Sequence, residues 1–197
     1  NFPVYLLSGT ILFSFFQDAV GQGLISILAN ASLITKVYMP KYIYPITKVL
    51  SCSVNLLISF IPLLLVTVIT GENITPAILL LPFAMLCLLL FCAGLSMFLA
   101  SAMVFFRDTQ YLWGIATLIW MYATPLFYPE TIIPEQYRVV LKINPLYHII
   151  KFVRTILIDG VSPEPRRYFY CLISAVFACI IGGIVFKKSQ DKFVLYI

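Results

Sequence analysis

The residue types that most often carry catalysis are few in this chain, and their spacing does not suit it. None of the nine glycines is followed by a lysine, so the GxxxxGK(S/T) loop that binds nucleotide phosphates is absent. The single histidine, His148, belongs to no HExxH motif, and no serine stands in a GxSxG setting. Glu130 and Glu135 are spaced so that a helix would place them on different faces. We therefore predict that this chain is not an enzyme, has no catalytic residue and holds no metal.

Polar side chains interrupt the first apolar run at QDAVGQG, which contains Gln17, Asp18 and Gln22. A carboxylate at the centre of a bilayer costs roughly 2.5–3.5 kcal/mol, so we expect Asp18 to face protein or water. The three side chains suit an ion or substrate site, and they equally suit hydrogen bonding between helices. His148 has no second titratable group in a nearby span, which favours an interfacial polar residue over a proton relay.

The composition indicates a membrane protein. Hydrophobic residues make up 61% of the 197, charged residues 11%, and the mean hydropathy is +1.00. A soluble domain has about 45–50% apolar and about 25% charged residues. The net charge is +5, but the cations lie in short clusters at the edges of apolar runs, which is typical of topology signals and not of a nucleic-acid-binding face. The five cysteines form no CxxC pair and behave as small hydrophobes.

The elements that must position these residues are predicted to be helices. We expect one all-α integral membrane domain, residues 1–197, with five transmembrane helices and the two chain ends on opposite sides. The lysine and arginine clusters place a loop at residues 33–48 and a tail at residues 187–197 in the cytoplasm, and residues 128–167 outside. The predicted spans are Val4–Ile34, Ile46–Thr70, Ala77–Phe106, Tyr111–Phe127 and Tyr168–Phe186.

The outer segment is predicted to contain two short amphipathic helices. The first is PEQYRVVLKI, which begins with Pro134 and Glu135, a pair suited to a first helical turn. The second is NPLYHIIKFVRTILIDG, in which His148, Lys151 and Arg154 are expected to form one polar stripe opposite an apolar face. Gly160 is expected to end this helix.

Aromatic residues gather near the ends of the predicted spans. An interfacial aromatic belt explains this distribution, and a path for a polysaccharide is the alternative, since sugar rings stack on aromatic faces. The cluster comprises Phe13, Phe15, Phe16, Phe105, Phe106, Trp113, Trp120, Tyr122, Phe127 and Tyr128.

The loop LITKVYMPKYIYP, residues 33–45, stands between two apolar runs. Pro40 and Pro45 each disfavour helix in the preceding residue, so the first long helix must stop, turn and restart. On these residues alone, an interfacial loop with anchoring tyrosines and snorkelling lysines is the simpler interpretation. A binding element for a cytoplasmic partner is the other.

Several blocks of the sequence resemble the ABC-2 family of transport permeases, specifically the polysaccharide and teichoic acid exporters of bacteria. The resemblance covers nearly the whole chain and is most specific at VYMPKYIYP, FRD, PLFYP and NPLY, which occupy Val37–Pro45, Phe106–Asp108, Pro125–Pro129 and Asn144–Tyr147. Family members usually have six spans and a preceding amphipathic helix. Since this chain lacks that helix and one span and begins without methionine, we expect an N-terminally truncated fragment.

The resemblance implies the channel-forming subunit of an ATP-driven exporter in the bacterial cytoplasmic membrane. Two permease chains would form a homodimer, and two separate ATPase subunits would bind the ATP and magnesium. The expected substrate is a lipid-linked polysaccharide: O-antigen, capsule or teichoic acid. The alternatives are an ABC-2 permease for a drug or lipid, and a membrane scaffold without transport activity.

The resemblance also implies roles for particular residues. Lys36 and Lys41 would offer charge to acidic groups of the ATPase, Tyr38 and Met39 would supply apolar contact, and Pro40 would fix the turn. The whole coupling set is Lys36, Val37, Tyr38, Met39, Pro40, Lys41, Arg107 and Asp108. The candidate channel lining is Phe13, Phe16, Asp18, Trp113, Trp120 and Tyr122. The candidate gate of short re-entrant helices is Pro129, Pro134, Asn144, Pro145, Tyr147 and Arg154.

Overall fold

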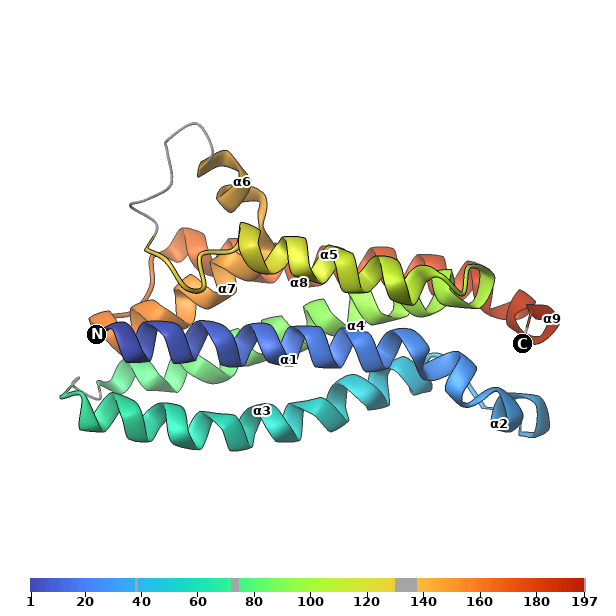
Figure 1. Ribbon diagram of the computed structural model, residues 1–197, viewed down its shortest axis with the longest axis horizontal. Coiled ribbons are helices and arrows are strands. Elements are labelled where there is room, and N and C mark those ends of the chain that lie inside the picture. The colour runs from blue at the N-terminus through green and yellow to red at the C-terminus, as the bar shows by residue number, and fades with distance from the viewer. Residues whose placement is uncertain (38, 72–74, 130–137, 197) are drawn as a thin grey trace.

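The computed structural model describes residues 1–37, 39–71, 75–129 and 138–196, and within these ranges every regular element is a helix (Figure 1). Four helical segments are long and apolar enough to cross a membrane. They are α1 (Phe2–Ala29), α3 (Ile43–Ile69), the 3-10 turn η1 (Pro76–Leu80) continuing into α4 (Leu81–Phe105), and α8 (Pro165–Ser189). The prediction of an all-α membrane protein is confirmed at this level.

The predicted count of five spans is not confirmed. The fourth predicted run forms α5 (Thr109–Ala123), which has 15 residues. At 1.5 Å per residue, a helix of this length measures about 22 Å, less than the hydrocarbon core of roughly 30 Å. The run ends early because the chain leaves the helix at Thr124, ahead of Pro125, which disfavours helix in the residue before it.

The connections gather at two opposite ends of the bundle (Figure 1). One end holds α2 (Ala31–Lys36), the turn between α4 and α5, and the C-terminal elements η5 (Gln190–Lys192) and α9 (Phe193–Tyr196). The other end holds the N-terminus, α7 (Pro145–Arg154) and the π-helical turn η4 (Thr155–Asp159), with α6 (Arg138–Ile143) toward the middle. The two chain ends therefore lie at opposite ends of the bundle (Figure 1).

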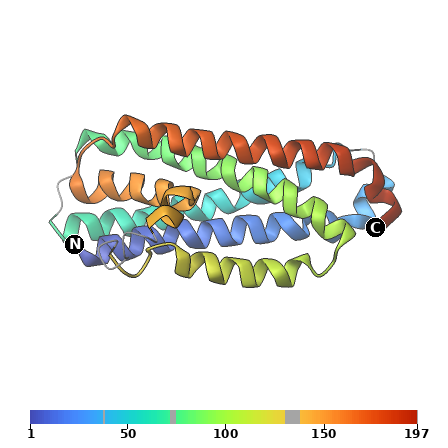
Figure 2. The ribbon, with the colours of Figure 1, turned by 90° about the horizontal axis from the view of Figure 1, so that it is seen from above.

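Helix α4 is central, because α8, α1, α3 and α7 all pack on it, and α8 lies along it for most of its length (Figure 2). Glycine allows this approach. A Cβ built on Gly94 would overlap the backbone of Ala178 and Cys179, and one built on Gly182 would overlap the backbone of Gly94. Small residues at such crossings let two membrane helices gain van der Waals contact where lipid offers no hydrophobic driving force.

A matched pair of substitutions tests this crossing. Gly182→Ala and Gly183→Ala add the same methyl group to adjacent positions of α8, but nothing lies within 4 Å of the Cβ at Gly183. Overpacking costs roughly 1–3 kcal/mol, so we expect Gly182→Ala to lower the melting temperature in detergent by several degrees. Gly183→Ala should leave it unchanged or raise it slightly, since alanine favours helix. Equal melting temperatures for the two variants would contradict the proposed role of the crossing.

Candidate functional site

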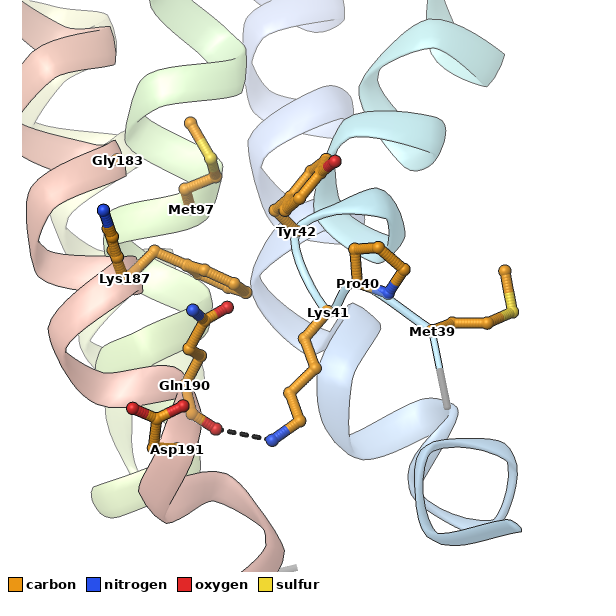
Figure 3. Close-up of a pocket in the computed structure, with 10 residues that line it drawn as sticks. Met39, Pro40, Lys41, Tyr42, Met97, Gly183, Lys187, Gln190 and Asp191 are labelled. Carbon is orange, nitrogen blue, oxygen red and sulfur yellow. Dashed lines mark hydrogen bonds between the residues drawn. The ribbon is translucent and has the colours of Figure 1, made fainter. Parts of the chain in front are cut away.

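The predicted coupling loop forms one wall of a cleft at the end of the bundle that also holds the C-terminus (Figure 3). The opposite wall comes from the last turns of α8 and from η5, including Lys187, Gln190 and Asp191, and Met97 of α4 also lines it. The cleft has a volume of about 500 Å³. The structure thus places the loop against the C-terminal segment, which the sequence did not predict.

Lys41 bridges the two walls. Its Nζ donates a hydrogen bond of 2.6 Å to the carbonyl oxygen of Gln190, the residue that caps the C-terminus of α8. The same Nζ lies 5.8 Å from the centroid of the Phe193 ring. A cation at a helix C-terminus is favourable, because the last carbonyls carry partial negative charge and lack helical partners. Lys41 therefore points toward the C-terminal segment of its own chain (Figure 3), and its predicted role, a charge offered to an ATPase, stays a prediction.

Beneath the cleft lies a second apolar core, separate from the main one. It joins the loop to the ends of three spans, since Tyr44 of α3, Val104 of α4 and Phe186 of α8 are all buried in it. Phe193 contributes a ring that contacts Phe186 edge-on, with centroids 5.3 Å apart. The complete buried set is Ile27, Ile34, Tyr44, Ala100, Val104, Phe186 and Phe193.

The remaining described coupling residues point to the outside. Lys36, Val37 and Met39 are exposed, and Met39 points away from α8 in Figure 3, whereas Lys41 points toward it. Arg107 and Asp108 are also exposed, in the turn between α4 and α5 at the same end of the bundle. Pro40 is exposed and lines the cleft. Tyr38 lies outside the described residues.

At the opposite end, Arg154 connects three parts of the chain. Its guanidinium donates to the carbonyls of Pro125 at 2.8 Å, Tyr5 at 3.0 Å and Leu126 at 3.2 Å, and lies 3.4 Å from the centroid of the Tyr5 ring. Gly9 permits this position, because a Cβ there would lie 2.5 Å from an Arg154 nitrogen. Arg154 is only 7% exposed.

The predicted stripe of His148, Lys151 and Arg154 is therefore wrong at its last member. Arg154 stands seven residues after the half-buried Tyr147 and therefore on nearly the same face of α7. It is buried because the end of α7 packs against α1 and against the Pro125–Leu126 segment, whose carbonyls its guanidinium binds. The glycine prediction is correct, since Gly160 ends the helical segment with a left-handed φ of 65°.

Asn144 connects α7 to α5 through side-chain hydrogen bonds. Its Oδ1 accepts from the Trp120 indole at 2.9 Å and from the backbone of Leu146 at 3.1 Å, and its Nδ2 donates to the Thr124 hydroxyl at 2.8 Å. It is thus both the N-cap of α7 and a link between helices. Pro145 follows as the first residue of α7, where a missing N–H costs nothing.

The other predicted gate residues surround this link. Tyr147 is half-buried and its hydroxyl accepts from Lys151 at 2.8 Å. Pro129 is exposed, and Pro134 lies outside the described residues. In the same segment, burial raises the pKa of the Tyr128 phenol, so this hydroxyl stays protonated and donates to the carbonyl of Tyr122 at 2.7 Å.

Most of the aromatic side chains predicted to line a channel instead pack in the interior of the helix bundle. Phe16 is fully buried and contacts Phe91, Trp113 and Trp120, with ring centroids between 5.1 and 6.0 Å apart. Phe13 is buried beside it. These rings join α1, α4 and α5. Of the predicted lining residues, Asp18 and Tyr122 are exposed on the surface of the chain.

The bundle of long apolar helices, with a basic loop at one end and short helices at the other, is that of an integral membrane protein. The sequence matches the family described as ABC-2 type transporter over residues 1–158, and the chain belongs to this family. It is 27% identical to the O-antigen export system permease protein RfbA of Myxococcus xanthus, over 98% of this chain and 75% of the relative. It is 25% identical to the protein of the same name from Klebsiella pneumoniae, over 98% and 74%.

Three residues of these two sites had no recognisable signal in the sequence. Gln190 acts through its backbone carbonyl, which any residue could supply. Tyr5 and Phe193 are among many aromatic residues near span ends, and only the packing selects them. Gly9 leaves the space that Arg154 occupies, but a glycine in the sequence does not say which side chain fills that space.

Arg154→Met tests the outer link. The Pro125 and Leu126 carbonyls would lose their guanidinium donors, at a cost of roughly 1–3 kcal/mol each, so we expect a fall of several degrees in the melting temperature in detergent. Lys151→Met, one turn earlier on α7, is the matched control and should change the free energy of unfolding by less than about 1 kcal/mol. If Arg154→Met lowers the melting temperature no more than Lys151→Met does, the three carbonyl bonds do not stabilise this end of the bundle specifically.

Proposed function

We propose that this chain is the channel-forming permease subunit of an ATP-driven exporter of a lipid-linked polysaccharide in the bacterial cytoplasmic membrane. It would act as a homodimer with two separate ATPase subunits that bind the ATP and magnesium. Family membership supports a transport subunit, and the names of both relatives reported above favour a polysaccharide over a drug or lipid. The absence of a phosphate-binding loop in the sequence agrees with a separate ATPase.

The proposal that the permease docks on an ATPase is supported by a group of exposed basic and apolar residues at one end of the bundle. Lys36, Val37 and Met39 are exposed there, and the turn with Arg107 and Asp108 lies at the same end. This is the end that the lysine and arginine distribution assigns to the cytoplasm. We propose that this surface docks on the ATPase, with Met39 and Val37 as apolar anchors.

Lys41 has a different proposed role from its neighbours. Its bond to the Gln190 carbonyl joins the docking loop to the end of α8. A push on the loop would therefore reach α8 directly, and α8 packs along most of the central helix α4. We propose that Lys41 transmits movement within the permease and makes little contribution to ATPase affinity.

Met39→Ser and Lys36→Ala separate the two kinds of docking contact. Buried apolar anchors at interfaces are worth about 2 kcal/mol or more, whereas exposed ion pairs are worth about 0–1 kcal/mol. We expect Met39→Ser to weaken binding of the ATPase to the full-length permease by about 30-fold, and Lys36→Ala by less than about 5-fold. Pull-down titration in nanodiscs measures both affinities. If neither variant changes the affinity, the loop is an interfacial element and the docking proposal fails.

Lys41→Met and Lys41→Arg test transmission. Methionine keeps the length of the side chain but cannot donate to the Gln190 carbonyl, whereas arginine can. We expect Lys41→Met to retain ATPase binding while export per ATP hydrolysed falls at least several-fold in the reconstituted complex. Lys41→Arg should restore most of that ratio. Normal coupling in Lys41→Met would refute the proposed role.

A further inference from the structure

A polar groove runs between α1 and α3, away from both sites described above. One wall carries side chains spaced four residues apart on α1, which brings them onto one face of the helix. The facing wall belongs to α3, and the buried side chains of Cys52 and Leu56 form part of the groove. The volume is about 240 Å³. Its polar lining is Thr10, Ser14, Asp18, Gln22, Asn55 and Ser59.

The groove lies near the middle of two candidate spans, which is the depth expected for the bilayer centre. Asp18 is near the middle of α1, and Asn55 is near the middle of α3, which packs beside it (Figure 1). Both side chains are exposed on the surface of the chain. Lipid cannot hydrogen-bond to them at this depth, so a charged or amide group facing it is strongly disfavoured.

The polar groups of the groove are mostly unused. Within the described ranges, Asp18, Gln22 and Asn55 make no side-chain hydrogen bond and no ion pair, whereas the Thr10 hydroxyl is bound to the carbonyls of Leu6 and Leu7. The groove thus offers one carboxylate acceptor, two amides that both donate and accept, and serine hydroxyls. Among the described residues, no lysine, arginine or histidine lines it, and the nearby Lys48 stands one turn before Cys52 on α3, outside the lining.

We propose that this groove is a water-filled binding site for the hydroxyl groups of uncharged sugars in the exported polymer. The inference rests on the proposed function and adds a preference among its substrates. Sugar hydroxyls donate to the Asp18 carboxylate and exchange hydrogen bonds with the amides of Gln22 and Asn55. A phosphodiester polymer brings negative charge close to the Asp18 carboxylate, which is the charged group among the lining residues, and like charges in contact repel each other even in water. Asp18 therefore admits neutral glycan and disfavours polyanionic glycan.

Cysteine labelling tests whether the groove holds water. The full-length permease, assembled with its ATPase in nanodiscs, would carry a single cysteine at Ser14 or at Leu57 after replacement of the native cysteines. Leu57 is on α3 at a similar depth, exposed but outside the groove. A water-soluble trimethylammonium methanethiosulfonate should label Ser14→Cys at least tenfold faster than Leu57→Cys. Equal, negligible rates would mean that lipid or another helix fills the groove, and would overturn the proposal.

Protection by two oligomers tests the sugar preference. Mannotetraose should slow labelling of Ser14→Cys at least threefold, whereas a glycerol phosphate tetramer at the same concentration should not. Adding Asp18→Asn removes the negative charge and keeps an amide, so the glycerol phosphate tetramer should then protect as well. Protection by both oligomers before that change, or by neither, overturns the proposal.

ATP-dependent export by the same preparation distinguishes a failure of the groove assignment from a failure of the proposed exporter function. If the complex exports polysaccharide while the protection pattern fails, only the groove assignment is wrong. If the permease neither binds an ATPase nor exports in its presence, the proposed function itself fails, whatever the labelling shows.

Discussion

The close crossing of α4 and α8 at Gly94 and Gly182 is the contact on which the arrangement of the bundle depends. Helices in lipid gain nothing from burying apolar surface against each other, since lipid is equally apolar, so shape and close approach must hold them together. The same device recurs on the other side of α4, where Gly23 of α1 lies against Ser96. With α8 and α1 fixed on opposite sides of one helix, the two ends of the bundle acquire defined surfaces. The sites at those ends follow from this packing.

Each end is then closed by a cation bound to backbone carbonyls. Arg154 binds the carbonyls of Tyr5, Pro125 and Leu126 at one end, and Lys41 binds that of Gln190 at the other. Carbonyls at helix ends and in irregular segments have no helical partner, and in a membrane they must be satisfied within the protein. A long cationic side chain can reach them from a neighbouring element. These two cations therefore join elements that are far apart in sequence.

The sequence alone predicted the parts of the structure that depend on local pattern. Apolar runs located the four long helices, and Gly160 marked a helix end. The sequence blocks that resemble ABC-2 permeases indicated the family to which the chain belongs. Features that depend on contacts between elements were missed. The length of α5 could not be read from hydropathy, because the apolar character continues past its end at Ala123. The inward direction of Arg154 and Lys41 could not be read either, because basic residues near span ends usually face water.

The exposed surface of the chain divides into two kinds at membrane depth. Many exposed positions on α3 and α8, such as Leu57, Ile61 and Phe177, are apolar and suit lipid. The exposed face of α1 instead carries Ser14 and Asp18, with Gln17 and Gln22 beside them. A helix with a polar face in hydrocarbon is stable only if water or protein covers that face. The buried aromatic cluster around Phe16 turns the opposite side of α1 toward α4 and α5, so this polar face is held outward by packing. The packing of the bundle therefore holds the polar side chains of α1 outward near the middle of this helix. Water or another polar molecule, and not lipid, must provide their hydrogen-bond partners there.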